Sequence, residues 1–506
     1  MSISRRALLG AGAAGIASSA LGNISFDRPP QKGGKKPKNI IFCVADGLSI
    51  QTLSMASYFR QITEGKPSYW QTLMNEEYAV NGLQETRSLN SVVTDSSAAS
   101  STWGCGRRIW NGQVNVYPDG TELRTLDSLM KETGMRTGLV TTTTITHATP
   151  AGFAVNCDDR GAEPLIAEKY LKAGVDVLFG GGNNHFAADK RRDKKDLYAD
   201  FAKAGYSIAR TRDDLMGLKG NKFLGIFSDS HRPYAVDHMN SPELMKSTPT
   251  LAETVKVALD KLKGSPKGFL LQIEGGKVDH AAHGNDFGAM VYDQIAFEEA
   301  VKVAVEFALQ DKETLVIITA DHATGGPSLN GAGAGYGDST GGLKLLSGIK
   351  SSHEKVMSAL GSSPTRSTVQ DVIKDRLGIG LSTDEADVIV AARAGNSPFK
   401  SSIFHGSSNA TLAMILGNHT KVTWTSGNHT CDHVMVTAVG PGSEQMAGIT
   451  PNVRFFDIML AAKGLKWSNP TMSYEDAVKA RAKKGLVDKE GGRLVAMIDD
   501  GIDHGV

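Results

Sequence analysis

The chain has 506 residues, of which 40% are hydrophobic and 22% charged, and its formal net charge is +1. This is the composition of an ordinary globular protein, and the small net charge gives no indication of a nucleic-acid or acidic-membrane partner. The four cysteines are scattered and contain no CxxC pair, which argues against a thiolate zinc site and a disulfide scaffold. If the protein is exported, one disulfide could form, with Cys105–Cys157 as the first choice.

The N-terminal segment has the pattern of an export signal. Arg5 and Arg6 precede an uncharged run of small and apolar residues from Ala7 to Ala20, which is shorter than the ~20 residues that span a membrane. Paired arginines before such a run favour a twin-arginine signal over an ordinary secretory signal or an uncleaved anchor. We expect residues 1–37 to be an export signal and linker, the protein to be periplasmic or secreted, and the mature chain to have no membrane span.

The first predicted strand and the stretch after it both carry candidate site residues. Residues 39–44 are an apolar run typical of a buried parallel strand, and Asp46 follows at the sheet edge where α/β folds place their sites. A helix N-cap explains Asp46 alone equally well.

Residues 92–106 are nearly all small, and Asp95 and Ser96 lie where a helix would begin. A helix start favours anions, and Ser96 could attack an electrophile, but the stretch alone fits a closely packed helix.

The second predicted strand, over residues 137–142, leads to a further group of candidates. Pro150 disfavours a helical conformation at the residue before it, so we expect His147 and Thr149 to lie on an extended segment with their side chains on one side. Arg160 follows in a polar turn. It is either a surface arginine or a bidentate clamp for a phosphate group.

Carboxylates also follow two later apolar runs. Glu274 comes after residues 268–273, and Asp321 with His322 comes after residues 315–320. Asp46, Glu274 and Asp321 thus each lie at the C-terminal end of a predicted strand, and three such placements by chance are improbable. Asp279 and His283 are four residues apart, so they share one helix face and form a good zinc pair. His429 lies in a loop before the run 434–439.

The other patterns complete an α/β arrangement. Apolar and amphipathic spacing predicts strands over 175–179 and 434–439 and helices over 126–133, 251–263, 291–310 and 383–393. Residues 186–250 indicate little function. From about 325 to 425, glycine and serine clusters predict a loop-rich insertion with a few short helices, which we expect to cap or flank the site.

Taken together, these blocks resemble the alkaline phosphatase family. The matching motifs are 46–47 after the first strand, 94–96, 147–150, 274–283, 320–322 and 427–430. They follow the family's order and cover most of residues 38–330 and 426–442. The resemblance implies one large α/β domain over residues 38–506, with a mostly parallel β-sheet between helices and the insertion at about 325–425.

The resemblance also implies a role for each motif residue. Ser96 is the nucleophile that becomes a phosphoserine, Arg160 grips the phosphate, and Asp95 orients that arginine. The implied ligands are Asp279, His283 and His429 for one Zn²⁺, Asp46, Asp321 and His322 for a second Zn²⁺, and Asp46, Thr149 and Glu274 for one Mg²⁺. The first zinc activates the hydrolytic water and the second activates Ser96.

Three positions vary within the family or depart from it. His147, which we count among the metal-site residues, stands where some members have Asp, and His280, which we count as substrate-binding, stands where some have Lys. Ser97 stands where Ala is usual. Aligned without a gap from Asp95, Ser96 takes the nucleophile's place, and a shift of one helical position rotates a side chain by about 100°. Only one of the two serines can therefore face the metals.

The expected activity is hydrolysis of small phosphate monoesters at alkaline pH, which releases inorganic phosphate outside the cytoplasm. One alternative is a phosphodiesterase or sulfatase on the same metals, against which Arg160 and the Mg²⁺ ligands argue. A second is a non-catalytic exported metal- or phosphate-binding protein, against which the presence of both Ser96 and Arg160 argues. The oligomeric state is open, with a homodimer as one expectation.

The export signal can be tested directly. Replacing Arg5 and Arg6 by lysine keeps the charge but removes the twin-arginine pair, so the double variant should remain in the cytoplasm. Cell fractionation followed by detection of the protein gives the distribution. Unchanged export of the variant would indicate the ordinary secretory route instead.

Overall fold

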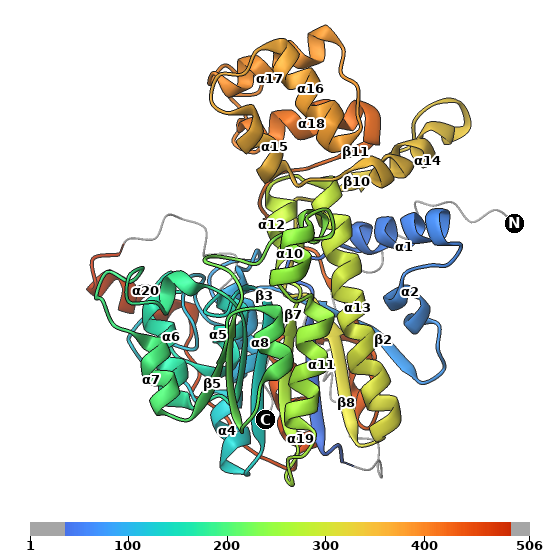
Figure 1. Cartoon of the computed structure of the whole chain (residues 1–506). Coiled ribbons are helices and arrows are strands. Elements are labelled where there is room, and N and C mark those ends of the chain that lie inside the picture. Colours follow the sequence, from blue (N-terminus) through green and yellow to red (C-terminus); the bar gives the residue numbers. More distant parts are fainter. Residues whose placement is uncertain (1–35, 487–506) are drawn as a thin grey trace, which may run out of the picture. The chain divides into compact units, whose positions relative to one another are not determined.

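A ten-stranded β-sheet lies at the centre of the computed structural model, which describes residues 36–486 (Figure 1). From edge to edge the strands are β14 (Gly448–Pro451), β2 (Ala79–Glu85), β13 (Val434–Val439), β8 (Thr314–Thr319), β1 (Asn39–Val44), β7 (Phe269–Glu274), β3 (Arg136–Thr144), β4 (Val177–Gly181), β6 (Lys222–Ile226) and β5 (Tyr206–Ala209). β13 is antiparallel to both neighbours, and the other pairs in this sheet are parallel. The predicted α/β class with a mostly parallel sheet is confirmed.

The central strands are buried on both faces, which explains their unbroken apolar sequence. In β1, Ile41 and Cys43 pack into one hydrophobic cluster, while Ile40 and Phe42 pack into the cluster on the opposite face. All four side chains are inaccessible to solvent. A strand covered by helices on both sides has no polar face, so it shows no alternation of polar and apolar residues.

Helices cover both faces of the sheet. Outside the insertion, those that contribute to the first cluster are α1 (Ile50–Glu64), α2 (Tyr69–Met74), α8 (Arg212–Gly217), α9 (Ala235–Met239), α11 (Leu251–Leu262), α12 (Lys277–His283) and α13 (Phe287–Asp311). Those that contribute to the second are α3 (Ser96–Cys105), α4 (Leu126–Glu132), α5 (Ala148–Ala154), α6 (Glu163–Ala173), α7 (Leu197–Lys203) and α19 (Arg454–Ala462). Further short elements are α10 (Pro242–Ser247), α20 (Tyr474–Lys483), and the 3₁₀ turns η1 (Asn183–His185) and η4 (Ser443–Met446).

The insertion at 325–425 contains the expected short helices, and more of them than its glycine and serine clusters suggested. It contains α14 (Gly337–Lys344), α15 (His353–Leu360), α16 (Arg366–Leu377), α17 (Thr383–Arg393) and α18 (Ser408–Thr420), with 3₁₀ turns η2 (Ala334–Tyr336) and η3 (Leu345–Gly348). The serines and glycines that suggested loops are helix boundaries: Ser352 and Ser407 are N-caps, and Gly378 is a left-handed C-cap. The predicted helix at 383–393 is confirmed.

Two small antiparallel pairs close the base of the insertion. β10 (Ser328–Leu329) pairs with β11 (Val422–Thr423), which joins its beginning to its end. β9 (Ala323–Thr324) pairs with β12 (His429–Thr430). The first of these pairs is labelled between α15 and α14 in Figure 1, where the chain leaves and re-enters the main part of the fold.

The segment around His147 differs from the prediction. His147 is the N-cap of α5, and Thr149 and Pro150 lie inside its first turn rather than on an extended segment. Proline is tolerated there because the N–H groups of the first turn have no partner within the helix. The rule that a residue before proline avoids the helical region therefore fails at this helix start.

Several other expectations concern parts of the chain outside the sheet. Cys105 and Cys157 are both free, so the proposed disulfide is not formed in the structure. Among residues 36–486, no helix is both long enough and apolar enough to cross a membrane. The export signal, most of the linker and the last twenty residues of the predicted domain lie outside the described residues.

Burial of one acid makes a testable contribution to stability. Asp127, in the first turn of α4, is 2% exposed, and its Oδ1 atom has no hydrogen-bond partner among the described residues. Burial raises the pKa of this carboxyl from 3.8 to about 6, although Lys131 partly opposes the shift. The folded state therefore disfavours the charged form, and this contribution destabilises the protein progressively as the pH rises through about 6.

We predict that Asp127→Asn raises the melting temperature relative to the wild type above about pH 6, and that the gain shrinks as the pH falls from about 6 toward 3.8, below which both states bind the proton. The gain corresponds to about 3 kcal/mol, since each pKa unit is worth about 1.4 kcal/mol. Thermal unfolding of both proteins from pH 4 to pH 8 measures it. A difference in melting temperature that does not change with pH would contradict the prediction.

Candidate active site

Three predicted carboxylates lie level with one another at the carboxyl edge of the sheet. Asp46 follows β1, Glu274 ends β7, and Asp321 follows β8. Val44 pairs with Glu274 on one side and with Thr319 on the other, so these strand ends are in register. All three carboxylates are inaccessible to solvent. The three strands are adjacent, which brings residues far apart in the sequence into one cluster.

Asp46, Asp321 and His322 form one group that could hold a metal ion. His322 Nε2 lies 3.1 Å from Asp321 Oδ2 and 3.6 Å from Asp46 Oδ1. Ser96 Oγ lies 3.2 Å from the same nitrogen. The structure thus brings together the residues that the family resemblance assigns to the second zinc, with the hydroxyl of Ser96 beside them.

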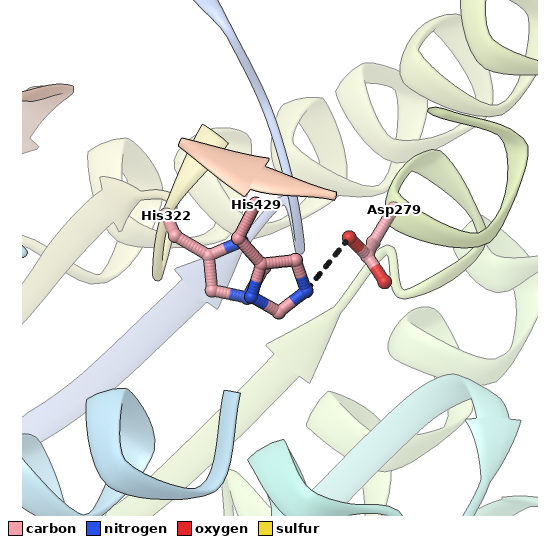
Figure 2. Close-up of side chains that lie close together, drawn as sticks. All are labelled: Asp279, His322 and His429. Carbon is pink, nitrogen blue, oxygen red and sulfur yellow. Dashed lines mark ion pairs between the residues drawn. The ribbon is translucent and has the colours of Figure 1, made fainter. Parts of the chain in front are cut away.

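Asp279, His283 and His429 lie close together beside the first group, and Asp279 and His429 form with His322 a second set that could hold a metal ion. His283 Nε2 lies 3.3 Å from Asp279 Oδ2 and 3.0 Å from His429 Nε2. His429 reaches the site because β13 runs antiparallel, so the segment before it lies at the carboxyl edge of the other strands. His322 adjoins this group too: its ring stacks on that of His429 at 3.6 Å between centroids, with Asp279 facing both (Figure 2). His322 therefore lies between the two groups.

Asp46 also belongs to a third group with His147 and Glu274. His147 Nδ1 lies 3.8 Å from Glu274 Oε1. The hydroxyl of Thr143 donates to the other oxygen of Glu274 at 3.2 Å. Thr149, which the resemblance assigns to the same metal, is completely buried, and its hydroxyl has no partner among the described residues.

The donor atoms of these groups fit metal ions. The buried ligand atoms without a hydrogen-bond partner among the described residues are Asp46 Oδ1 and Oδ2, Asp321 Oδ2, Glu274 Oε1, His147 Nδ1 and Thr149 Oγ1. Buried polar atoms are nearly always paired, and these atom types are the ligands of Zn²⁺ and Mg²⁺. Burial, together with the carboxylates of Asp321 and Asp279, raises the pKa of Asp46 well above its ordinary value. Bound cations would offset this repulsion.

The imidazoles of His283 and His429 are each held by a backbone carbonyl. His283 Nδ1 lies 2.6 Å from the carbonyl oxygen of Gly427, and His429 Nδ1 lies 2.8 Å from that of Thr94. A carbonyl oxygen only accepts, so both Nδ1 atoms carry the proton. The Nε2 lone pairs are then directed into the site, which is the usual arrangement of a metal-binding histidine.

Thr324 is a site residue that the sequence did not reveal. Its hydroxyl donates to Asp279 Oδ1 at 2.6 Å and lies 3.2 Å from His322 Nδ1. Because the hydroxyl proton is used by Asp279, the imidazole Nδ1 must donate to the hydroxyl oxygen, which leaves His322 Nε2 facing Asp321 and Asp46. Thr324 lies beside a glycine pair at the start of the insertion, and no local pattern marks it.

Ser96 and Ser97 point in different directions at the start of α3. Asp95 is the N-cap and accepts from the Ala98 N–H at 2.8 Å. The hydroxyl of Ser97 lies 2.9 and 2.8 Å from the two oxygens of Asp95. Ser97 therefore faces the capping carboxylate, while Ser96 faces His322. The free N–H groups of the first turn also favour negative charge near Ser96.

Arg160 connects the start of α3 to the third metal group. Its Nη1 lies 3.1 Å from Asp95 Oδ2, and its Nη2 lies 3.2 Å from His147 Nε2. Asp95 Oδ2 also accepts from the Gly112 N–H at 2.9 Å. These contacts fix the guanidinium within the site, where its planar group of donors could bind phosphate oxygens.

His280 lies in a cluster of three imidazoles, one of which the sequence did not indicate. Its ring centroid is 4.4 Å from that of His231 and 5.6 Å from that of His147. Burial, followed by the charge of Lys277, holds the pKa of His280 well below its usual value, so this imidazole is neutral. His231 comes from the segment 186–250, accepts from the Thr144 N–H at 3.1 Å, and belongs to no recognised motif.

The fold and site define a class of enzyme. Buried carboxylates and imidazoles at the edge of a parallel sheet can bind cations close to a serine hydroxyl and a guanidinium. Such an arrangement can stabilise the oxygens of a phosphoryl group while a nucleophile displaces its leaving group. The class is a metal-dependent hydrolase of phosphate esters.

Comparison with known proteins gives the family. The family model for alkaline phosphatase matches residues 37–465. The chain is 32% identical over 448 residues to alkaline phosphatase 3 of Bacillus subtilis. This alignment covers 86% of this chain and 91% of that protein. It is 36% identical to the solved Thermus thermophilus alkaline phosphatase, with a TM-score of 0.84 over 89% of this chain and 96% of the other. The chain belongs to the alkaline phosphatase family.

The activity follows from this membership. The chain is an alkaline phosphatase, a phosphomonoesterase of a metal-dependent family. A further relative, 31% identical over 478 residues, is the alkaline phosphatase of Schizosaccharomyces pombe. The alternatives of a phosphodiesterase or sulfatase and of a non-catalytic binding protein are therefore not supported.

Proposed function

We propose that the protein hydrolyses phosphate monoesters at alkaline pH through a phosphoserine on Ser96. The observation that carries this proposal is the position of Ser96 Oγ, 3.2 Å from His322 Nε2 and at the start of α3. The hydroxyl oxygen attacks phosphorus, the ester oxygen leaves with the alcohol, and water then displaces the serine to release inorganic phosphate. Each displacement exchanges one P–O bond for another, so the products are the alcohol and phosphate.

The metal content forms part of the proposal. Asp279, His283 and His429 would hold one Zn²⁺. Asp46, Asp321 and His322 would hold the second, and Asp46, Thr149 and Glu274 would hold one Mg²⁺, with His147 beside it. When bound, these ions would stabilise the attacking and leaving oxygens of an in-line displacement. The support for the second zinc and the magnesium is the set of buried ligand atoms without partners among the described residues. The support for the first zinc is the close approach of Asp279, His283 and His429, whose ligand atoms lie 3.0, 3.3 and 3.7 Å apart.

Arg160 has the position to hold the phosphoryl group. Its contacts with Asp95 and His147 orient the guanidinium between Ser96 and the third metal group. We propose that Arg160 binds two oxygens of the phosphoryl group. In a diester one of these oxygens would carry a second ester group. We assign His280 to substrate binding, because a neutral imidazole can donate a hydrogen bond to phosphate without adding a positive charge.

We also propose an exported location. Residues 1–37 would be a twin-arginine signal and linker, and residues 38–506 the catalytic domain, active in the periplasm or outside the cell on small phosphate monoesters. The supporting observation is the arginine pair before an uncharged run of small and apolar residues. A twin-arginine substrate folds before export, so the metals would bind in the cytoplasm. The homodimer remains a prediction.

The two adjacent serines provide the test of the mechanism. Ser96→Ala should lower turnover of nitrophenyl phosphate by several orders of magnitude with metals still bound, because the nucleophile is lost. Ser97→Ala should stay within roughly tenfold of the wild type, since its hydroxyl contacts Asp95 rather than the reacting group. Trapping the phosphoenzyme at acid pH and mapping the labelled peptide identifies the nucleophile directly.

Either of two results would contradict this assignment. Label on Ser97 would mean that the helix presents the other serine to the metals. Wild-type turnover by Ser96→Ala with no trapped phosphoenzyme would mean that water attacks the ester directly. Metal analysis of each variant is the control, because loss of a bound ion would lower turnover for a different reason.

A further inference from the structure

The turn between α12 and α13 directly follows the proposed zinc ligand His283, and Asn285 lies within it. Asn285 is 2% exposed and has a φ of 48°, in the left-handed region that asparagine tolerates better than most residues. Its Nδ2 donates to the carbonyl oxygen of Ala282 at 3.0 Å and to that of Ser426 at 2.7 Å. Both partners are acceptors, so both amide hydrogens are used.

The segment that Asn285 holds leads directly to the other imidazole of the same group. Ser426 is followed by Gly427, whose carbonyl oxygen accepts from His283 Nδ1 at 2.6 Å. The approach is close, because a Cβ atom on Gly427 would lie 3.0 Å from the carbonyl oxygen of His283. Two residues further on, His429 Nε2 lies 3.0 Å from His283 Nε2. Asn285 thus connects the two segments that carry these histidines.

Both ends of the helical insertion meet at this place. Gly325, at its beginning, accepts from the Ser426 N–H at 3.2 Å and donates to the carbonyl oxygen of Asn428 at 2.8 Å. From within the insertion, the His353 N–H at the start of α15 donates to Asp286 Oδ2 at 2.5 Å. The insertion is therefore joined to the α12–α13 turn both through its closing segment and through α15.

We propose that Asn285 is a positioning residue through which the insertion sets the spacing of His283 and His429. The inference rests on the zinc ligands of the proposed function. By holding Ser426, the amide fixes the segment 426–429 against the end of α12. Without this amide, the carbonyl that orients His283 and the ring of His429 would move independently of α12, and the ion bound between them would be released more readily.

The Asp46, Asp321 and His322 group should not depend on Asn285. Its carboxylates follow β1 and β8 in the middle of the sheet, and all three side chains are inaccessible to solvent. Although the ring of His322 stacks on that of His429, its Nδ1 contacts Thr324, and Asp321 accepts from the Gly47 N–H at 3.1 Å, so two of the three ligands have contacts outside the segment 426–429. Loss of the Asn285 amide should therefore weaken one zinc site and spare the other, whereas general destabilisation would weaken both.

The test compares zinc release from the wild type and from Asn285→Gly, both loaded with two zinc ions. Glycine adopts a positive φ without strain, so this variant removes the amide and keeps the turn. Release into a chromogenic chelator should show one zinc equivalent leaving about 10–100-fold faster than in the wild type, the range expected when a group that orients a metal ligand is lost. The second equivalent should leave at the wild-type rate.

Two further variants separate positioning from stability. Asn285→Asp keeps the size of the side chain and tolerates a positive φ, but its carboxylate cannot donate to Ser426, so it should also accelerate release of one zinc. Asn469→Ala is the matched control: Asn469 is 3% exposed, and its Nδ2 donates to the carbonyl oxygens of Cys105 and Arg124 at 2.8 and 2.9 Å. It should lower the melting temperature and leave zinc release unchanged.

The possible outcomes distinguish this inference from the proposed function. If both Asn285 variants release both zinc ions at the wild-type rate, or accelerate the two equally, the positioning role is wrong. Zinc retention by the wild type would still support the proposed ligands in that case. If the wild type retains no zinc after loading, the proposed ligands themselves are wrong.

Discussion

Four buried carboxylates at one edge of the sheet, Asp46, Glu274, Asp279 and Asp321, determine what else the site must contain. Three are inaccessible to solvent and Asp279 is 3% exposed. Burying like charges together is costly unless opposite charges or hydrogen bonds compensate. The surrounding imidazoles and Arg160 compensate in part, while several carboxylate oxygens still lack a partner among the described residues. Bound cations are the compensation that fits both the charge and the geometry.

The sheet brings the members of this cluster together. β8, β1 and β7 are adjacent and parallel, so the acids that follow them meet at one edge, and Gly47, with a φ of 71°, allows the close approach of Asp279 to the turn after Asp46. The reversed direction of β13 brings His429 to the same edge, and α3 places Ser96 there by its first turn. Phosphoryl transfer needs mainly fixed positions and fixed charges. The sheet edge fixes the positions of the ligands. Metal ions bound to these ligands would supply the fixed positive charges.

The sequence was sufficient for residues whose position follows from local pattern, and insufficient for those whose position depends on tertiary contacts. Asp46 could be predicted because an acid after a buried parallel strand lies at the edge of the sheet. Thr149 was expected on an extended segment because it precedes Pro150. That restriction is weaker in the first turn of a helix, where the structure places both residues. Thr324 and His231 carry no local signal, since their partners are distant in the sequence. Of the insertion helices, only that at 383–393 was given bounds, because the capping serines and glycines of the others resemble loops.

The site depends most directly on cations that balance the buried carboxylates, and metal content measured together with unfolding tests this dependence. The purified protein should contain about two zinc ions and one magnesium ion per chain by elemental analysis. Chelation should remove them and lower the melting temperature, because ions that bind only the folded state stabilise it, by about 4 kcal/mol at a thousand times their dissociation constant. Adding zinc and magnesium back should restore the melting temperature. A metal-free protein with an unchanged melting temperature would contradict the account.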